Sequence, residues 1–209
     1  MLKQKRRIAI GVALLAGAMT LAACGSDSSD GKKDAGSTTP AATSGDNKPA
    51  ASSVSWPAPS DASARAKAAG LPMLGQEGQV LHIHSHLDVY VDGKVVTVPA
   101  LVGIDEAKQQ ISPLHTHDTT GVVHIESPVQ ADFTLGEFMT EWNVPITYNS
   151  LGTLKTGGGK ELHIFVNGKE QSGNPATLKL TAHAEIAVVY GSAADKVQVP
   201  TSYNWPQGL

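Results

Sequence analysis

The residues that follow position 80 alternate between two chemical classes, and this alternation constrains the fold most strongly. Odd positions are mostly apolar, whereas even positions carry polar side chains, in the order His82, His84, His86, Asp88 and Tyr90. A period of two predicts a β-strand with one apolar face against a core and one polar face. Three histidines therefore share the polar face of one predicted strand.

Turn signals place the neighbouring elements. An Asp-Gly pair at 92–93 predicts a tight turn, because glycine accepts the positive φ that hairpin turns need, so residues 80–98 are expected to form a hairpin. An Asn-Gly pair at 167–168 follows a predicted strand at 162–166, and a further strand is predicted at 186–190.

One well-marked helix is predicted among these strands. Thr134 and Glu137 have the spacing of a capping box, and an apolar stripe follows them up to Trp142. A shorter alanine-rich helix is expected to end at Gly70. We expect an α+β fold with a mainly antiparallel or mixed sheet that curls around the capped helix in a grasp-like arrangement. A β-sandwich with a helical insertion is the alternative.

Six of the eight histidines lie in one stretch that ends at Glu126, and they form two clusters. His-x-His on a strand places two imidazoles on one face, about 7 Å apart at Cα. Two such side chains can converge on one ion, since metal–nitrogen bonds are about 2.0–2.1 Å long. The candidate metal ligands are His82, His84, His86, His115, His117 and His124.

All three strand histidines on one ion would strain the strand, because they span about 13 Å at Cα. We therefore expect two of them, in the first place His84 and His86, to join one or two of the later group. That group comprises His115, His117 and His124. The sixth histidine is left for a supporting position or a second site.

Two carboxylates, Asp118 and Glu126, lie close to the histidines in the sequence. Each can accept the second ring N–H of a ligand histidine and fix its tautomer. Each is also a candidate general base if the site is catalytic. A histidine set without cysteine suits copper or zinc, and iron is less favoured. The two other histidines, His163 and His183, are interpreted as surface or core residues.

The first 23 residues have the form of an export signal: a basic start and then an apolar run at 8–23. That run is short for a membrane span, which needs about 20 residues. Its Leu-Ala-Ala-Cys ending resembles the bacterial lipobox, which implies cleavage before Cys24 and a lipid on the Cys24 sulfur. An ordinary free or buried cysteine is the alternative. Residues 24–59 are low in large apolar side chains and are predicted to tether a single domain at 60–209.

Lipidation of the only cysteine would leave the domain without a disulfide or a thiolate ligand. The leader holds four of the 16 Lys and Arg residues and none of the 19 Asp and Glu residues. The rest of the chain is therefore acidic and poorly suited to nucleic acid. These features predict an extracytoplasmic protein on the outer face of the cell membrane.

Residues 81–127 carry the pattern HxHxHLDVxVDG followed by PLHTHDTxGxxHxE. This pattern is similar to that of a family of histidine-rich secreted proteins of actinobacterial type. The resemblance extends more loosely to residues 134–142. It implies export and common descent, and no established activity attaches to it.

Three functions fit these observations. The first is a lipid-anchored protein that captures, buffers or delivers copper or zinc and exchanges it with a partner protein. The second is a metal-dependent enzyme, hydrolytic or redox, in which three histidines leave a coordination position open. The third is an interaction or pH-sensing domain that binds no metal. The first is preferred. The chain has neither a Gly-x-Ser-x-Gly motif nor a second cysteine, so a hydrolase that works without metal is not expected.

Overall fold

The structure is a computed structural model that describes residues 50–209. Its largest sheet has the strand order β11-β10-β12-β1-β6-β5, with β2 also paired to β1. The strands of this sheet are β1 (Leu81–Val91), β2 (Lys94–Val96), β5 (Leu114–His115), β6 (Val122–Ser127), β10 (Glu161–Val166), β11 (Lys169–Gln171) and β12 (Glu185–Gly191). The sheet is mixed, because β1 and β12 run parallel and the other pairs antiparallel.

Strand β1 is the axis of this sheet. Along one edge it pairs with β12 from His86 to Val91. Along the other edge its first half pairs with β6, and its last three residues pair with β2. The predicted hairpins at 92–93 and 167–168 are confirmed as the β1–β2 and β10–β11 connections. The first half of β1 therefore pairs mainly with β6, and the second half pairs with β12 and β2.

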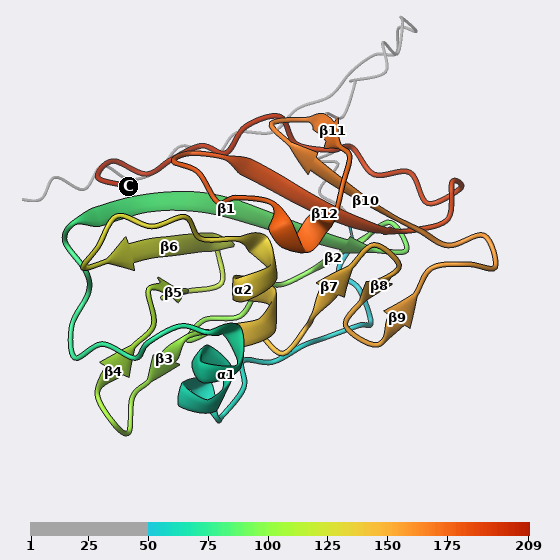
Figure 1. Cartoon of the computed structure of the whole chain (residues 1–209). Coiled ribbons are helices and arrows are strands. Elements are labelled where there is room, and N and C mark those ends of the chain that lie inside the picture. The colour runs from blue at the N-terminus through green and yellow to red at the C-terminus, as the bar shows by residue number, and fades with distance from the viewer. Residues whose placement is uncertain (1–49) are drawn as a thin grey trace, which may run out of the picture. The chain divides into compact units, whose positions relative to one another are not determined.

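The apolar face of the sheet packs on helix α2 (Leu135–Glu141) and the 3-10 turn η1 (Pro175–Thr177), and helix α1 (Ala62–Ala69) lies against α2, as Figure 1 shows. The expected capping box is present at the start of α2: Thr134 accepts from the Glu137 N–H and Glu137 accepts from the Thr134 N–H. Phe138 and Met139 on this helix are fully buried. The predicted α+β class is confirmed.

Two small sheets complete the domain. Strands β3 (Ile104–Asp105) and β4 (Gln110–Ile111) form one, and β7 (Ile146–Thr147), β8 (Ser150–Leu151) and β9 (Leu154–Lys155) form the other. Within residues 50–209, neither helix has the length and apolar character needed to cross a membrane.

The folded domain includes residues that we assigned to the tether. The Ser52 N–H donates to the Val95 carbonyl at 2.7 Å, which extends the sheet beyond β2. The Trp56 ring packs edge-on against Trp142 at 6.0 Å, and the Trp142 Nε1–H donates to the Trp56 carbonyl. The domain therefore begins before Ser60. The export signal, Cys24 and the first part of the tether lie outside the described residues.

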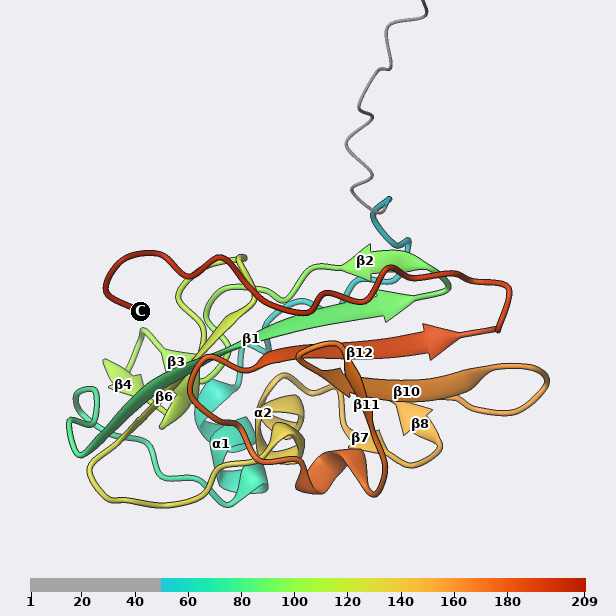
Figure 2. The same ribbon diagram turned by 90° about the horizontal axis from the view of Figure 1, so that it is seen from above.

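The C-terminal segment crosses the opposite face of the sheet from the helices (Figure 2). The Tyr203 ring stacks on His86 at 3.8 Å, and the Trp205 ring stacks on His183 at 4.7 Å. Much of the polar face is consequently interior, and His84 is only 4% exposed. Part of the polar face of β1 is therefore buried.

A buried carboxyl on α2 provides a test of the packing. Glu141 is 1% exposed, and within residues 50–209 neither of its carboxyl oxygens has a hydrogen-bond partner. Burial raises the pKa of Glu141 from 4.5 to about 8, and the nearby Ser112 hydroxyl offsets only part of this shift. The folded state therefore keeps a proton on Glu141 that the unfolded state releases, so stability falls as pH rises between about 4.5 and 8.

We predict that Glu141→Gln removes this pH dependence. The variant should gain about 4 kcal/mol over the wild type at pH 7.5 and almost nothing at pH 4.5. Urea unfolding at a series of pH values measures the difference, with Glu106→Gln on the surface as the control. An equal change at every pH would show that Glu141 is ionised in the folded state.

Candidate metal centre

Strand register places three imidazoles in a row across β1, β6 and β5. His84 lies opposite His124 in the β1–β6 pair, and His124 lies opposite His115 in the β6–β5 pair. Directly opposite residues of an antiparallel pair point to the same face of the sheet. The ring centroids are accordingly 4.5 Å apart for His84 and His124 and 5.1 Å apart for His115 and His124.

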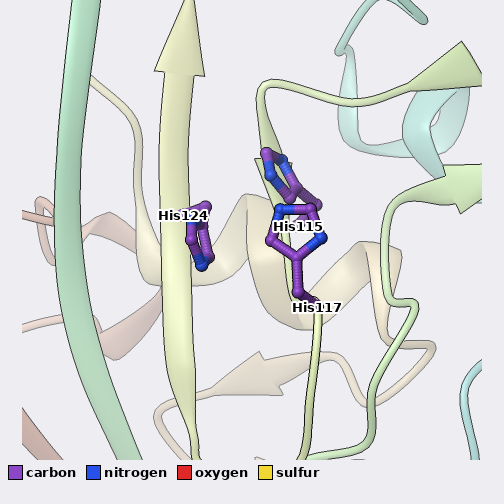
Figure 3. A group of neighbouring side chains, drawn as sticks. All are labelled: His115, His117 and His124. Atoms are coloured by element: carbon purple, nitrogen blue, oxygen red, sulfur yellow. The ribbon is translucent and has the colours of Figure 1, made fainter. Parts of the chain in front are cut away.

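His117 joins this row from the segment that follows β5. Its ring centroid lies 4.8 Å from that of His115 and 4.6 Å from that of His124. Figure 3 shows His124 on one strand, with His115 and His117 on the segment beside it. One ligand atom from each of the three lies within 4.8 Å of the others, so the group can hold a metal ion.

Glu126 lies among the histidines, and its side chain is 2% exposed. Its Oε1 is 2.9 Å from His124 Nδ1, 3.3 Å from His82 Nε2 and 3.8 Å from His84 Nε2. Its Oε2 is 4.0 Å from His115 Nε2. A second group that can hold a metal ion therefore consists of His82, His84 and Glu126.

Hydrogen bonds define which ring nitrogens can bind a metal. His115 Nδ1 lies 2.9 Å from the Ser112 carbonyl, which only accepts, so Nδ1 carries the proton. His124 Nδ1 likewise donates to Glu126. Both imidazoles keep the lone pair on Nε2. The His124–Glu126 contact has the form of a carboxylate that orients a ligand histidine.

The charge states also suit a metal. Burial, with His124 and His82 nearby, lowers the pKa of His84 to about 4. Burial likewise lowers the pKa of His115 to about 4. Burial opposes the ionisation of Glu126, but the hydrogen bond from His124 and the charges of the histidines outweigh it and keep its pKa below the ordinary value. At neutral pH the two imidazoles are neutral and the carboxylate is ionised, which are the forms that bind metals.

Three buried atoms at the centre have no hydrogen-bond partner among the described residues: His84 Nε2, His115 Nε2 and Glu126 Oε2. A buried polar atom without a partner costs about 1–3 kcal/mol, so such atoms call for an explanation. All three can present a lone pair, and a cation satisfies lone pairs from several directions at once. The donor set fits a bound transition metal.

Two histidines and a glutamate form the solvent-facing rim. His82 and His117 are each 44% exposed at the side chain, and Glu77 is 43% exposed. Glu77 Oε1 lies 3.5 Å from His117 Nε2, and Glu77 forms a further candidate group with His115 and Glu126. Sequence analysis missed Glu77, because it precedes β1 in a segment without periodicity or a local motif.

His86 lies apart from the other five clustered histidines, which differs from the expected pairing of His84 with His86. Its Nδ1 is 2.8 Å from Glu185 Oε2, and its Nε2 is 2.8 Å from the Thr120 carbonyl. Both ring nitrogens are occupied by these oxygen atoms, so neither is directed at the other histidines. Burial lowers the pKa of His86, but the hydrogen bond and charge of Glu185 outweigh it, and the net shift is upward. With Asp88, these residues form a separate candidate group.

Asp118 also occupies a different position from the one expected. Its carboxylate accepts hydrogen bonds from the backbone and hydroxyl of Thr120, which hold the pKa of Asp118 below its usual range. This is a local turn contact on the surface. His163 lies between two glutamates, 2.6 Å from Glu170, and His183 stacks on the C-terminal segment. Neither belongs to the cluster.

Fold and site together define an α+β domain with a buried histidine–carboxylate cluster on the face of a mixed sheet. Comparison of the chain with protein-family models, curated proteins and solved structures gave no match. The geometry of the residues themselves therefore carries the functional assignment.

The position of His86 leads to a specific expectation. His86→Leu leaves Glu185 buried without its cationic partner, so we predict a loss of about 3 kcal/mol in stability. Metal content should stay at the wild-type value. The double variant His86→Leu/Glu185→Leu should recover part of the lost stability, because it leaves no unpaired charge. Urea unfolding and elemental analysis check both statements, and a loss of metal in His86→Leu would make His86 a ligand.

Proposed function

We propose that this protein binds a transition metal, copper or zinc, through its clustered histidines and serves to capture, buffer or deliver that metal outside the cell membrane. The observation that carries the proposal is the set of three buried, unpartnered atoms on His84, His115 and Glu126. They converge with further histidines from three strands, and the groups that they form can hold a metal ion.

Ligand chemistry supports copper or zinc. Neutral imidazoles with a carboxylate suit Zn²⁺ and Cu²⁺, whereas calcium and magnesium prefer oxygen ligands. The described part of the chain contains no cysteine, and Met139 on α2 is buried in the core. Cysteine thiolates, which favour Cu⁺, are therefore not part of the described cluster.

The exposure of the rim supports exchange. His82 and His117 are each 44% exposed, whereas His84 and His115 are buried. A metal can therefore reach outer ligands first and then the inner ones. A partner protein that offers its own ligands can reach the same outer histidines. Capture and delivery need such graded access.

The location outside the membrane rests on the sequence. The apolar leader and the Leu-Ala-Ala-Cys24 ending support export and lipid attachment at Cys24. Few large apolar residues follow Cys24, so the next segment suits a tether between membrane and domain. A lipoprotein on the outer face of the membrane would contact metal ions that approach the cell from outside.

Metal analysis tests the binding proposal. The full-length chain, produced without added histidines and dialysed against metal-free buffer, should retain Zn²⁺ or Cu²⁺ at a fixed ratio to protein. His84→Ala/His117→Ala should reduce that ratio severalfold, and His163→Ala should leave it unchanged. Addition of the metal should also raise the unfolding temperature, since a ligand at 100 times its Kd adds about 2.7 kcal/mol.

The absence of metal would contradict the proposal. Retention of no metal by the wild type, together with an unchanged unfolding temperature after Zn²⁺ or Cu²⁺ is added, would rule out metal binding. The histidine face would then be an interaction or pH-sensitive surface.

Anchoring has its own test. Cys24→Ser should abolish incorporation of labelled fatty acid and release the protein from the membrane fraction, while Ser26→Ala should change neither. Equal labelling of the wild type and Cys24→Ser would exclude a lipid on Cys24.

A further inference from the structure

The cluster offers more ligands than a single tetrahedral ion takes, which is four. The groups whose ligand atoms lie within 4.8 Å of one another place His82 and His84 in one set and His115, His117 and His124 in another. The histidines therefore form two half-sites.

Glu126 lies between the half-sites. Its Oε1 is 3.3 Å from His82 Nε2 and 3.8 Å from His84 Nε2. Its Oε2 is 4.0 Å from His115 Nε2 and has no hydrogen-bond partner in the part of the chain that the structure describes. Oε1 also accepts from His124 Nδ1 at 2.9 Å, so this one buried carboxylate contacts histidines of both sets.

Resting on the metal-binding function proposed above, we infer that the cluster holds two transition-metal ions side by side, with Glu126 as the carboxylate that they share. His82 and His84 bind the first ion together with Glu126. The second ion is bound by His115, His117 and His124.

Strand pairing fixes the relation between the two half-sites. His84 of the first half-site and His124 of the second are directly opposite across β1 and β6, with ring centroids 4.5 Å apart. A rigid ladder therefore keeps the two ions adjacent. Adjacent metal ions with a carboxylate between them are an established arrangement for polarising a bound molecule from two sides.

Charge also favours a shared carboxylate. Imidazoles bind metals in their neutral form, so the histidines add no negative charge to offset two cations. Glu126 supplies one negative charge between the half-sites. Glu77, whose Oε1 is 3.5 Å from His117 Nε2, can supply a second charge at the rim of the second half-site.

Stoichiometry tests the inference. Zn²⁺ titration of the full-length chain, followed by calorimetry and elemental analysis, should give two equivalents for the wild type and for the control His163→Ala. His82→Ala/His84→Ala and His115→Ala/His117→Ala should each retain one equivalent. Circular dichroism without metal confirms that both variants are folded.

A second measurement uses the wild type alone and does not depend on variants. With one equivalent of Cu²⁺ the protein should show the paramagnetic resonance signal of an isolated ion. With two equivalents most of that signal should be lost, because adjacent copper ions couple magnetically. Glu126→Gln should weaken both ions together, by about tenfold or more.

The outcomes separate the two proposals. A single equivalent of metal in the wild type, or loss of all metal in either half-site variant, would overturn the two-ion inference and leave metal binding intact. A signal that doubles from one to two equivalents of Cu²⁺ would place the ions far apart and also overturn it. No bound metal at all would overturn the proposed function itself.

Discussion

The antiparallel pairing of β1 with β6 is the interaction on which the site depends. Its register sets His82 opposite Glu126 and His84 opposite His124. A slip of one residue would turn every histidine of β1 toward α2 and every apolar side chain away from the core. Burial of the apolar residues of β1 and β6 against α2 therefore also holds the ligands in place. Packing and metal geometry are consequences of the same register.

The polar face shows where stability and function conflict. Some buried polar atoms find partners, as the Trp142 indole does at the Trp56 carbonyl. At the cluster, His84, His115 and Glu126 each keep a buried atom without one. Each such atom costs about 1–3 kcal/mol, so the domain without metal bears a penalty that ligation would remove. In the described domain, where no cysteine is available for a disulfide, the core around α2 must offset this penalty.

Local patterns in the sequence predicted much of the fold, whereas contacts between distant segments escaped them. Alternation revealed β1, the Asp-Gly pair revealed its turn, and the Thr134–Glu137 spacing revealed the start of α2. The separation of His86 from the other histidines could not be predicted from these patterns, because it depends on strand pairing. Strand β6 pairs with β1 as far as His86, and β12 pairs with β1 from His86 onward. Glu185 reaches His86 across 99 positions of sequence, and no local signal marks such a partner.

The position of the metal itself tests the central claim most directly. Crystals of the zinc- or copper-loaded protein, measured at the absorption edge of the metal, would give its position without reference to any variant. Anomalous peaks should lie among His82, His84, His115, His117 and His124, each about 2.0–2.1 Å from imidazole nitrogens, with Glu126 beside them. Peaks only at His163 or elsewhere on the surface, with the cluster side chains unligated, would contradict the assignment of these histidines as a metal centre.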